Sequence, residues 1–150
     1  MSKKIVFATN YSPLSAEALR VATHLAGAEQ ATLLIVHVSE KERYPVGESC
    51  QEDPSPDAAE LDRLRSVLPN DQRVAVEHHL LYGEPGSAEI TQPGKAIVKF
   101  AAEQHADMVV VATHGRKGLA HLLMGDVAEN IIRNAPCPVV AVRHAANQEP

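Results

Sequence analysis

A short run of β-branched apolar residues, residues 107–112, constrains what this chain can fold into more than any other stretch. Such a run is typical of a strand that is buried on both faces within a parallel sheet. Residues 113–118 follow as a loop that contains two glycines, one arginine and one lysine. Gly125 closes the connection, and we expect Asp126 to begin a helix. The strand, the loop and the helix together predict one unit of an α/β fold.

The same stretch is a candidate anion-binding site. Glycine lets the backbone approach a phosphate closely, and the first turn of a helix offers free N–H groups and partial positive charge. The side chain of Asp126 can accept a hydrogen bond from one of these N–H groups, and Glu129 follows at the spacing of a capping box. The pattern therefore indicates either a phosphate site at this helix or a helix cap with no further role.

Strands and helices alternate along the rest of the chain. The predicted strands span residues 4–9, 31–38, 73–82, 107–112 and 138–143. The predicted helices lie between them: one runs from Ser12 to Gly27, one from Ser55 to Leu68, one over residues 96–104, and one from Asp126 towards Pro136 with Val127, Ile131 and Ile132 facing inward. This alternation implies right-handed crossovers and a parallel sheet. Because residues 73–82 alternate between apolar and polar, we expect that strand near a sheet edge.

Two long connections are rich in turn-forming residues, namely residues 39–56 and residues 83–94. The second is longer than the usual βα connection of about 2–6 residues. It also leaves the carboxyl end of a strand, which is the edge where open α/β sheets bind ligands. Residues 86–94 are therefore either a flap over a ligand or a neutral surface insertion.

The composition is that of one globular domain over residues 1–150, with its core in residues 4–143. The formal net charge of −5 and the aromatic content of 3% disfavour binding to DNA or RNA, since such proteins carry a basic face or stacking aromatics. Two cysteines make no disulfide framework, and neither a signal peptide nor a membrane-spanning run is recognisable. We expect a cytoplasmic protein that does not enter the membrane.

Two separated motifs resemble those of the universal stress protein family. The stretch Ala-Thr-His-Gly at residues 112–115, followed by nine residues and then Gly125 and Asp126, is similar to the nucleotide-loop signature of that family. The family's pattern is Gly-x-x-Gly, nine residues, then Gly and Ser or Thr. Residues 4–22 resemble the family's first strand and helix. The resemblance covers most of residues 4–143.

The resemblance implies an open five-stranded parallel sheet of Rossmann-like α/β type, with strand order 3-2-1-4-5 and helices on both faces. It implies a homodimer joined through the edge strand from Pro138 to Arg143, and a site for ATP or AMP at the carboxyl ends of strands 1 and 4. Some family members bind ATP and others do not. The candidate nucleotide-binding residues are Ala8, Thr9, Asn10, Val38, Val111, Ala112, His114, Gly115, Arg116, Gly125, Asp126, Val127 and Ala128.

Three of these positions depart from the family's pattern. Asn10 stands where ATP-binding members have an Asp that reaches the adenosine; it keeps an acceptor oxygen and loses the charge. Ala112 replaces the first glycine of the signature, and Asp126 replaces the Ser or Thr that contacts phosphate.

Asp126 changes the electrostatics of the candidate site most. Two unit charges about 4 Å apart repel by about 1 kcal/mol in water and about 4 kcal/mol at an effective dielectric of about 20. That repulsion corresponds to a roughly 5-fold to 700-fold loss of affinity. Arg116 and Lys117 could offset part of it, and a Mg²⁺ ion between Asp126 and the phosphates would turn it into an attraction.

The remaining candidates are weaker. His78 and His79 point to opposite faces of a strand, so they do not predict a shared metal. His37 is interpreted as a satisfied interior residue, and Cys137 as a packed thiol that nothing nearby activates.

Three functions remain open. The first is a stress-response regulatory homodimer with a variant adenine-nucleotide site. The second is a family member that has lost nucleotide binding and acts only through contacts with other proteins. The third is an adenylating or ATP-hydrolysing enzyme, which the absence of a recognisable general base disfavours beyond slow hydrolysis.

Overall fold

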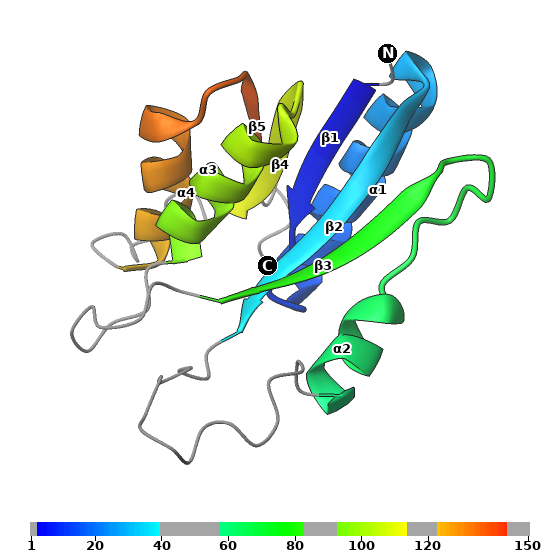
Figure 1. Ribbon diagram of the computed structural model, residues 1–150, viewed down its shortest axis with the longest axis horizontal. Helices are drawn as coiled ribbons and strands as arrows, with labels where there is room; N and C mark the ends of the chain where they lie inside the picture. Colours follow the sequence, from blue (N-terminus) through cyan, green and yellow to red (C-terminus); the bar gives the residue numbers. More distant parts are fainter. Residues whose placement is uncertain (1–2, 40–57, 83–92, 114–122, 144–150) are drawn as a thin grey trace, which may run out of the picture.

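The chain folds as an α/β domain around one parallel sheet (Figure 1). The computed structural model describes residues 3–39, 58–82, 93–113 and 123–143, and the side chains of residues 123–126 are not part of that description. Within these ranges the strand order is β3-β2-β1-β4-β5, and every neighbouring pair is parallel. The predicted fold class and strand order are confirmed.

The strands of the described residues are β1 (Lys3–Ala8), β2 (Ala31–Ser39), β3 (Val76–Tyr82), β4 (Met108–Thr113) and β5 (Val139–Arg143). The helices are α1 (Pro13–Glu29), α2 (Ala58–Arg65), α3 (Pro93–Gln104) and α4 (Leu123–Asn134). Four of the strands therefore begin within one residue of their predicted starts. The predicted start of β3 at residue 73 is wrong by three residues.

Strand β1 is the centre of the sheet. It pairs with β2 from Lys3 to Ala8 on one side, and with β4 from Ile5 to Phe7 on the other. Ile5, Val6 and Phe7 have at most 1% of their surface exposed. A strand covered on both faces and both edges must be almost wholly apolar, which is what the sequence of β1 provides.

Helices cover both faces of the sheet. Figure 1 shows α3 and α4 side by side on one face, with α1 behind the sheet. One group of buried side chains joins α1 and Leu64 of α2 to Ile5, Phe7 and Ile35. A second group joins α3 and α4 to Val6 and Val109. Successive residues along a strand thus place their side chains in the cores on opposite faces of the sheet.

Helix α1 begins where the Ser-Pro signal predicts. Ser12 has extended backbone and its side chain accepts a hydrogen bond from the N–H of Ser15, while Pro13 occupies the first helical turn. The predicted end at Gly27 is wrong. The helix continues to Glu29, and Gln30 ends it in a left-handed conformation with φ of 56°, its N–H directed at the carbonyls of the last turn.

The interpretation of Asp126 as the residue that caps helix α4 is wrong. The helix begins at Leu123, so Gly125 and Asp126 lie within its first turn and Asp126 does not precede it. Leu123 and Met124 are strong helix formers, which explains the earlier start. Ile131 is fully buried as predicted, but Ile132 is 55% exposed and does not face inward.

Helix α2 is shorter than predicted. It ends at Arg65, and Leu68, the predicted last residue of the helix, is 59% exposed. Pro69 follows directly and cannot continue a helix. The proposed start signal at residues 55–56 lies outside the described residues. Strand β3 lies at the edge of the sheet, as its alternating sequence predicts.

Helix α3 begins at Pro93, so Pro93 and Gly94 belong to a helix and not to the predicted insertion at residues 86–94. Proline suits the first turn of a helix because its missing N–H would have no helical partner there. Gly94 is buried against α4: a Cβ atom at this position would lie 3.0 Å from Cβ of Asn130 and 3.2 Å from the carbonyl oxygen of Val127. Glycine therefore lets α3 and α4 approach closely.

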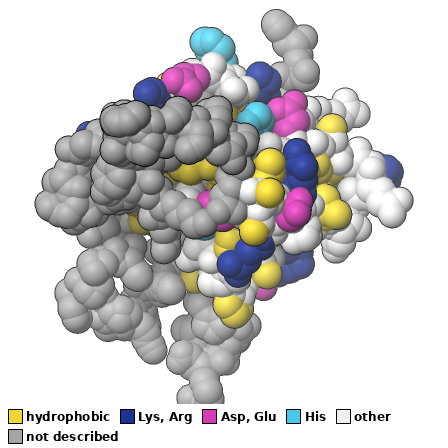
Figure 2. Space-filling model, turned by 60° about the horizontal axis from the view of Figure 1, so that its bottom comes forward, with side chains coloured by type: hydrophobic (Ala, Val, Ile, Leu, Met, Phe, Trp, Pro, Cys, Tyr) yellow, Lys and Arg dark blue, Asp and Glu magenta, His cyan; other side chains and the backbone are white. Residues whose placement is uncertain are grey.

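Several predictions fall outside the described residues, namely most of the long connections at 39–56 and 83–94 and the polar tail from residue 144. Among the helices that are described, none has the length and apolar character of a membrane span. On the face shown in Figure 2, described basic and acidic side chains are interspersed. Exposed pairs such as Lys3–Glu29 and Arg133–Glu129 contribute little to stability.

Two adjacent residues of α4 test this packing. Ile131→Ala removes a side chain that is fully buried between the helix and the sheet. It should lower the free energy of unfolding by about 2–5 kcal/mol. Ile132→Ala is the matched control, and it should change stability by less than about 0.5 kcal/mol because the side chain is largely exposed. Urea denaturation measures both. Equal losses in the two variants would contradict the orientation of α4.

Candidate functional site

A cavity of about 460 Å³ opens at the carboxyl ends of β1, β2 and β4, beside the N-terminal halves of α3 and α4. The described residues that line it are Ala8, Thr9, Asn10, Ser15, His37, Val38, Ser39, Pro93, Ile97, Val111, Ala112, Thr113, Val127 and Ala128. We call it the switch-point cavity, because β1 and β4 flank the point where the strand order reverses. Its volume is within the usual range of about 300–1,000 Å³ for small-molecule sites.

The structure gathers most of the predicted site residues around this cavity. Those that line it are Ala8, Thr9, Asn10, Val38, Val111, Ala112, Val127 and Ala128. Gly125 and Asp126 lie on the first turn of α4, and only their backbone is described. His114, Gly115 and Arg116 lie outside the described residues.

Sequence reasoning missed six lining residues, which are Ser15, His37, Ser39, Pro93, Ile97 and Thr113. Pro93 was assigned to a loop, although Pro-Gly directly before an apolar periodic stretch is also a helix-start signal. His37 was interpreted as a satisfied interior residue, and the structure agrees with this interpretation only in part. It is partly buried and bonded, but it also lines the cavity.

The turn between β1 and α1 is held by its own polar side chains. The side-chain oxygen of Asn10 accepts hydrogen bonds from the N–H of Ser12 at 3.0 Å and from the hydroxyl of Ser15 at 2.6 Å. The N–H of Asn10 in turn donates to Oγ of Ser15 at 3.1 Å. Oγ1 of Thr9 accepts from the N–H of Tyr11 at 2.9 Å. Such side-chain bonds to nearby backbone are typical of turns that precede a helix.

Tyr11 occupies a strained position in this turn. Its φ is 64°, in the left-handed region that bulky residues rarely adopt. Its ring packs on the ring of His37 with centroids 4.5 Å apart, and the guanidinium carbon of Arg63 lies 3.9 Å from the centroid of the Tyr11 ring. These contacts on Tyr11 offset the backbone strain, because cation–π and aromatic pairs each contribute favourably.

The contact with Thr9 determines the tautomer of His37. Nδ1 of His37 lies 2.7 Å from the carbonyl oxygen of Thr9. A carbonyl oxygen only accepts, so Nδ1 carries the hydrogen. The neutral ring therefore has its lone pair on Nε2, and it can accept a hydrogen bond there.

Helix α2 is joined to the same rim. Ser39 is fully buried at the end of β2, and its hydroxyl lies 2.9 Å from each carboxylate oxygen of Glu60. Arg63, one turn further along α2, contacts Tyr11. The helix thus reaches the wall of the cavity through two polar contacts, in addition to the buried side chain of Leu64.

Burial dominates the ionisation of Tyr11. Burial raises the pKa of the Tyr11 phenol above its ordinary value of 10.0; Arg63 opposes this shift and Glu60 adds to it. The hydroxyl is buried and has no hydrogen-bond partner among the described residues.

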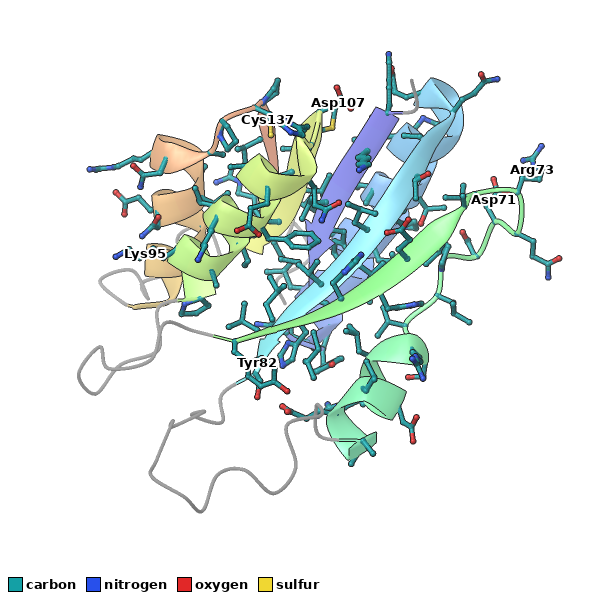
Figure 3. All side chains as sticks on the ribbon, viewed as in Figure 1. Asp71, Arg73, Tyr82, Lys95, Asp107 and Cys137 are labelled. Carbon is teal, nitrogen blue, oxygen red and sulfur yellow. The ribbon has the colours of Figure 1, made fainter. Side chains whose placement is uncertain are left out.

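Cys137 matches the interpretation of a packed thiol. It is partly buried, and burial raises its pKa, with a smaller contribution from Asp107. Figure 3 shows Cys137 and Asp107 together at the end of the sheet away from Tyr82. A thiol with a raised pKa is a poor nucleophile at neutral pH.

The lining of the cavity combines an apolar wall with a polar rim. Its inner wall is aliphatic, with Val38, Val111 and Ile97, and its rim carries hydroxyl, amide and imidazole groups. Among the described lining residues His37 is the one titratable side chain. Within the described ranges no three His, Cys, Asp or Glu side chains lie close enough to hold a metal ion.

Comparison with known proteins points to one family. The universal stress protein family matches residues 1–143. A universal stress protein of Methanocaldococcus jannaschii is 32% identical over 147 residues, which cover 94% of this chain and 82% of that protein. A universal stress protein of Thermus aquaticus is 30% identical over 146 residues, which cover 95% of this chain and 100% of that protein. The crystal structure of a universal stress protein in complex with cAMP matches with a TM-score of 0.67 at 25% identity, covering 96% of this chain and 98% of that chain.

Tyr11→Phe tests the state of the buried hydroxyl. A hydroxyl that is buried without a partner is unfavourable, so its removal should leave the protein equally stable at pH 7 or more stable by up to about 1 kcal/mol. Because the folded state holds the phenol proton more tightly than the unfolded state, wild-type stability should fall as the pH rises above 10.

The variant should lose less stability in that range. Denaturant titrations at pH 7 and pH 10.5 measure the difference. A destabilisation of more than about 1 kcal/mol at pH 7 would show that the hydroxyl has a partner after all.

Proposed function

Because this chain belongs to the universal stress protein family, we propose that it is a stress-response regulatory protein that binds an adenine nucleotide, AMP or ATP, in the switch-point cavity. The observation that carries the proposal is the cavity itself: the residues that resemble the family's nucleotide positions line one space of suitable size at the reversal point of the sheet. The relative solved in complex with cAMP supports an adenine ligand for this fold.

The aliphatic wall and the polar rim suit the two halves of such a ligand. A nucleobase is flat and largely apolar on its faces, so it fits between Val38 of β2 and Ile97 of α3. The sugar and phosphate need hydrogen-bonding groups, which Asn10, Ser15 and Thr113 provide from the rim. The proposal assigns binding to the cavity and makes no claim of catalysis.

The departure at Ala112 weighs little against this proposal. Ala112 packs against the core formed by α1 and α2, whereas Val111 belongs to the core formed by α3 and α4. The cavity is bounded by α3 and α4, through Pro93, Ile97 and Val127. The methyl group of Ala112 thus has packing partners in that core, although the residue also lines the cavity.

The departure at Asp126 leaves one alternative open. If its carboxylate repels the phosphates, nucleotide binding is lost and the protein acts only through contacts with other proteins. If it holds Mg²⁺ against the phosphates, binding requires that ion. The proposal extends to a cytoplasmic homodimer that pairs through β5, because β5 ends the sheet and its outer edge has no strand partner among the described residues.

Titration calorimetry on nucleotide-stripped protein tests the site. Wild-type protein should bind ATP or AMP, and Ala8→Leu should weaken that binding about tenfold or more, because the larger side chain enters the cavity beside Val38. Ala102→Leu is the matched control on the exposed surface of α3, and it should bind as the wild type does.

The titration is repeated with and without Mg²⁺. Binding only with Mg²⁺ would support a metal held by Asp126. Absence of binding up to millimolar nucleotide in both conditions would overturn the nucleotide proposal and favour the alternative.

Light scattering tests the dimer. The wild type should have twice the 16.2 kDa mass of the chain at micromolar concentration. Ala141→Asp places a charge on an exposed residue in the middle of β5, where a two-fold pairing would bring two like charges close together, and should shift the mass to that of the monomer. Ala102→Asp carries the same change on α3 and should remain dimeric. A monomeric wild type would refute pairing through β5.

A further inference from the structure

The orientation of the Asn10 side chain is determined without ambiguity. One of its two polar atoms accepts a hydrogen bond from the backbone N–H of Ser12 at 3.0 Å. A backbone N–H can only donate, so that atom is the oxygen Oδ1 and not the amide nitrogen. The hydroxyl of Ser15 donates to the same oxygen at 2.6 Å. Both lone pairs of the oxygen are therefore occupied within the turn.

What Asn10 offers to a ligand follows from this orientation. The residue is exposed and lines the switch-point cavity, and no described residue bonds to its amide nitrogen Nδ2. The amide nitrogen carries two hydrogens and accepts nothing. Asn10 therefore presents only donors to the cavity. Asn10 keeps an acceptor oxygen, as expected, but Ser12 and Ser15 use that oxygen within the turn.

A carboxylate at the same position would present the opposite chemistry. One of its oxygens could accept from Ser12 and Ser15 as Oδ1 does now. The other oxygen would then stand in the place of Nδ2 as a charged acceptor, which attracts sugar hydroxyls as donors and repels phosphate. The change from carboxylate to amide thus exchanges the preferred partner at this point of the rim.

We propose that Asn10 is a specificity-determining residue that donates to a phosphate oxygen of the bound nucleotide, so that the cavity selects ligands whose phosphate reaches the turn between β1 and α1. This inference rests on the proposed function and specifies which part of the nucleotide that function recognises. A hydrogen bond to a charged phosphate oxygen is about twice as strong as one to a neutral sugar hydroxyl. The guanidinium of Arg63, held over the ring of neighbouring Tyr11, lies beside the same turn, and the carboxylate of Glu60 lies on the same rim against Ser39.

The central test is Asn10→Asp, which keeps the size of the side chain and an oxygen for Ser12 and Ser15. Titration calorimetry with adenosine, 3′-AMP and 5′-AMP separates the phosphate from the rest of the ligand. We expect the variant to lose about tenfold or more in affinity for at least one AMP isomer, because a donor becomes a repelling charge. Affinity for adenosine should change less than about threefold. The isomer that loses more identifies the phosphate that Asn10 contacts.

Two further variants control for charge and for orientation. Asn70→Asp makes the same chemical change at an exposed residue next to Asp71, which Figure 3 places at the opposite end of β3 from Tyr82, so all three ligands should bind as to the wild type. Ser15→Ala removes one of the two bonds that orient the amide, and should reduce AMP affinity by a smaller factor of about threefold. Thermal melting of each variant confirms that the fold is retained.

The outcomes distinguish this inference from the function on which it rests. If the wild type binds none of the three ligands, the proposed function fails, and the inference fails with it. If the wild type binds them and Asn10→Asp weakens adenosine and both AMP isomers equally, or none of them, the inference alone is overturned. Selective loss of AMP binding supports it.

Discussion

The parallel pairing of β1 with β2 on one side and β4 on the other is the constraint on which the rest of the structure depends. A strand enclosed in this way has no contact with water on any side, so Ile5, Val6 and Phe7 can only be apolar. Polar residues are first tolerated where the strand ends, at Thr9 and Asn10. The same enclosure that stabilises the core therefore concentrates the hydrogen-bonding groups at one edge of the sheet, where the strand order reverses and the cavity opens.

The rim of the cavity is organised by hydrogen bonds within the protein itself. Asn10, Ser12 and Ser15 satisfy one another in the turn that starts α1, and Nδ1 of His37 is bonded to Thr9. Each of these bonds removes one donor or acceptor from the set that a ligand could use. The chemistry that remains is a consequence of the turn, and it cannot be read from the residue types alone.

The sequence allowed the architecture to be predicted more closely than the site. Apolar runs located four strands, alternation located β3, and the Ser-Pro pair located the start of α1, because all three are local signals with a direct physical cause. The end of α1 was missed because Gln30, and not a glycine, takes the left-handed position. The start of α4 was missed because helix propensity at Leu123 outweighed the capping pattern at Asp126. The direction of the Asn10 amide was unpredictable, since it depends on which neighbours the fold brings within bonding distance.

The close contact at Gly94 links helix spacing to the size of the cavity. Pro93 and Ile97 on α3 and Val127 and Ala128 on α4 line the cavity. The two helices are in close contact at Gly94, where an added Cβ atom would lie 3.0 Å from Cβ of Asn130. A larger residue there would act as a spacer that moves the helices apart and widens the cavity between them. The width of the cavity thus depends on a residue that does not line it, and changes at residue 94 are a route by which a chain of this fold could come to have a wider cavity.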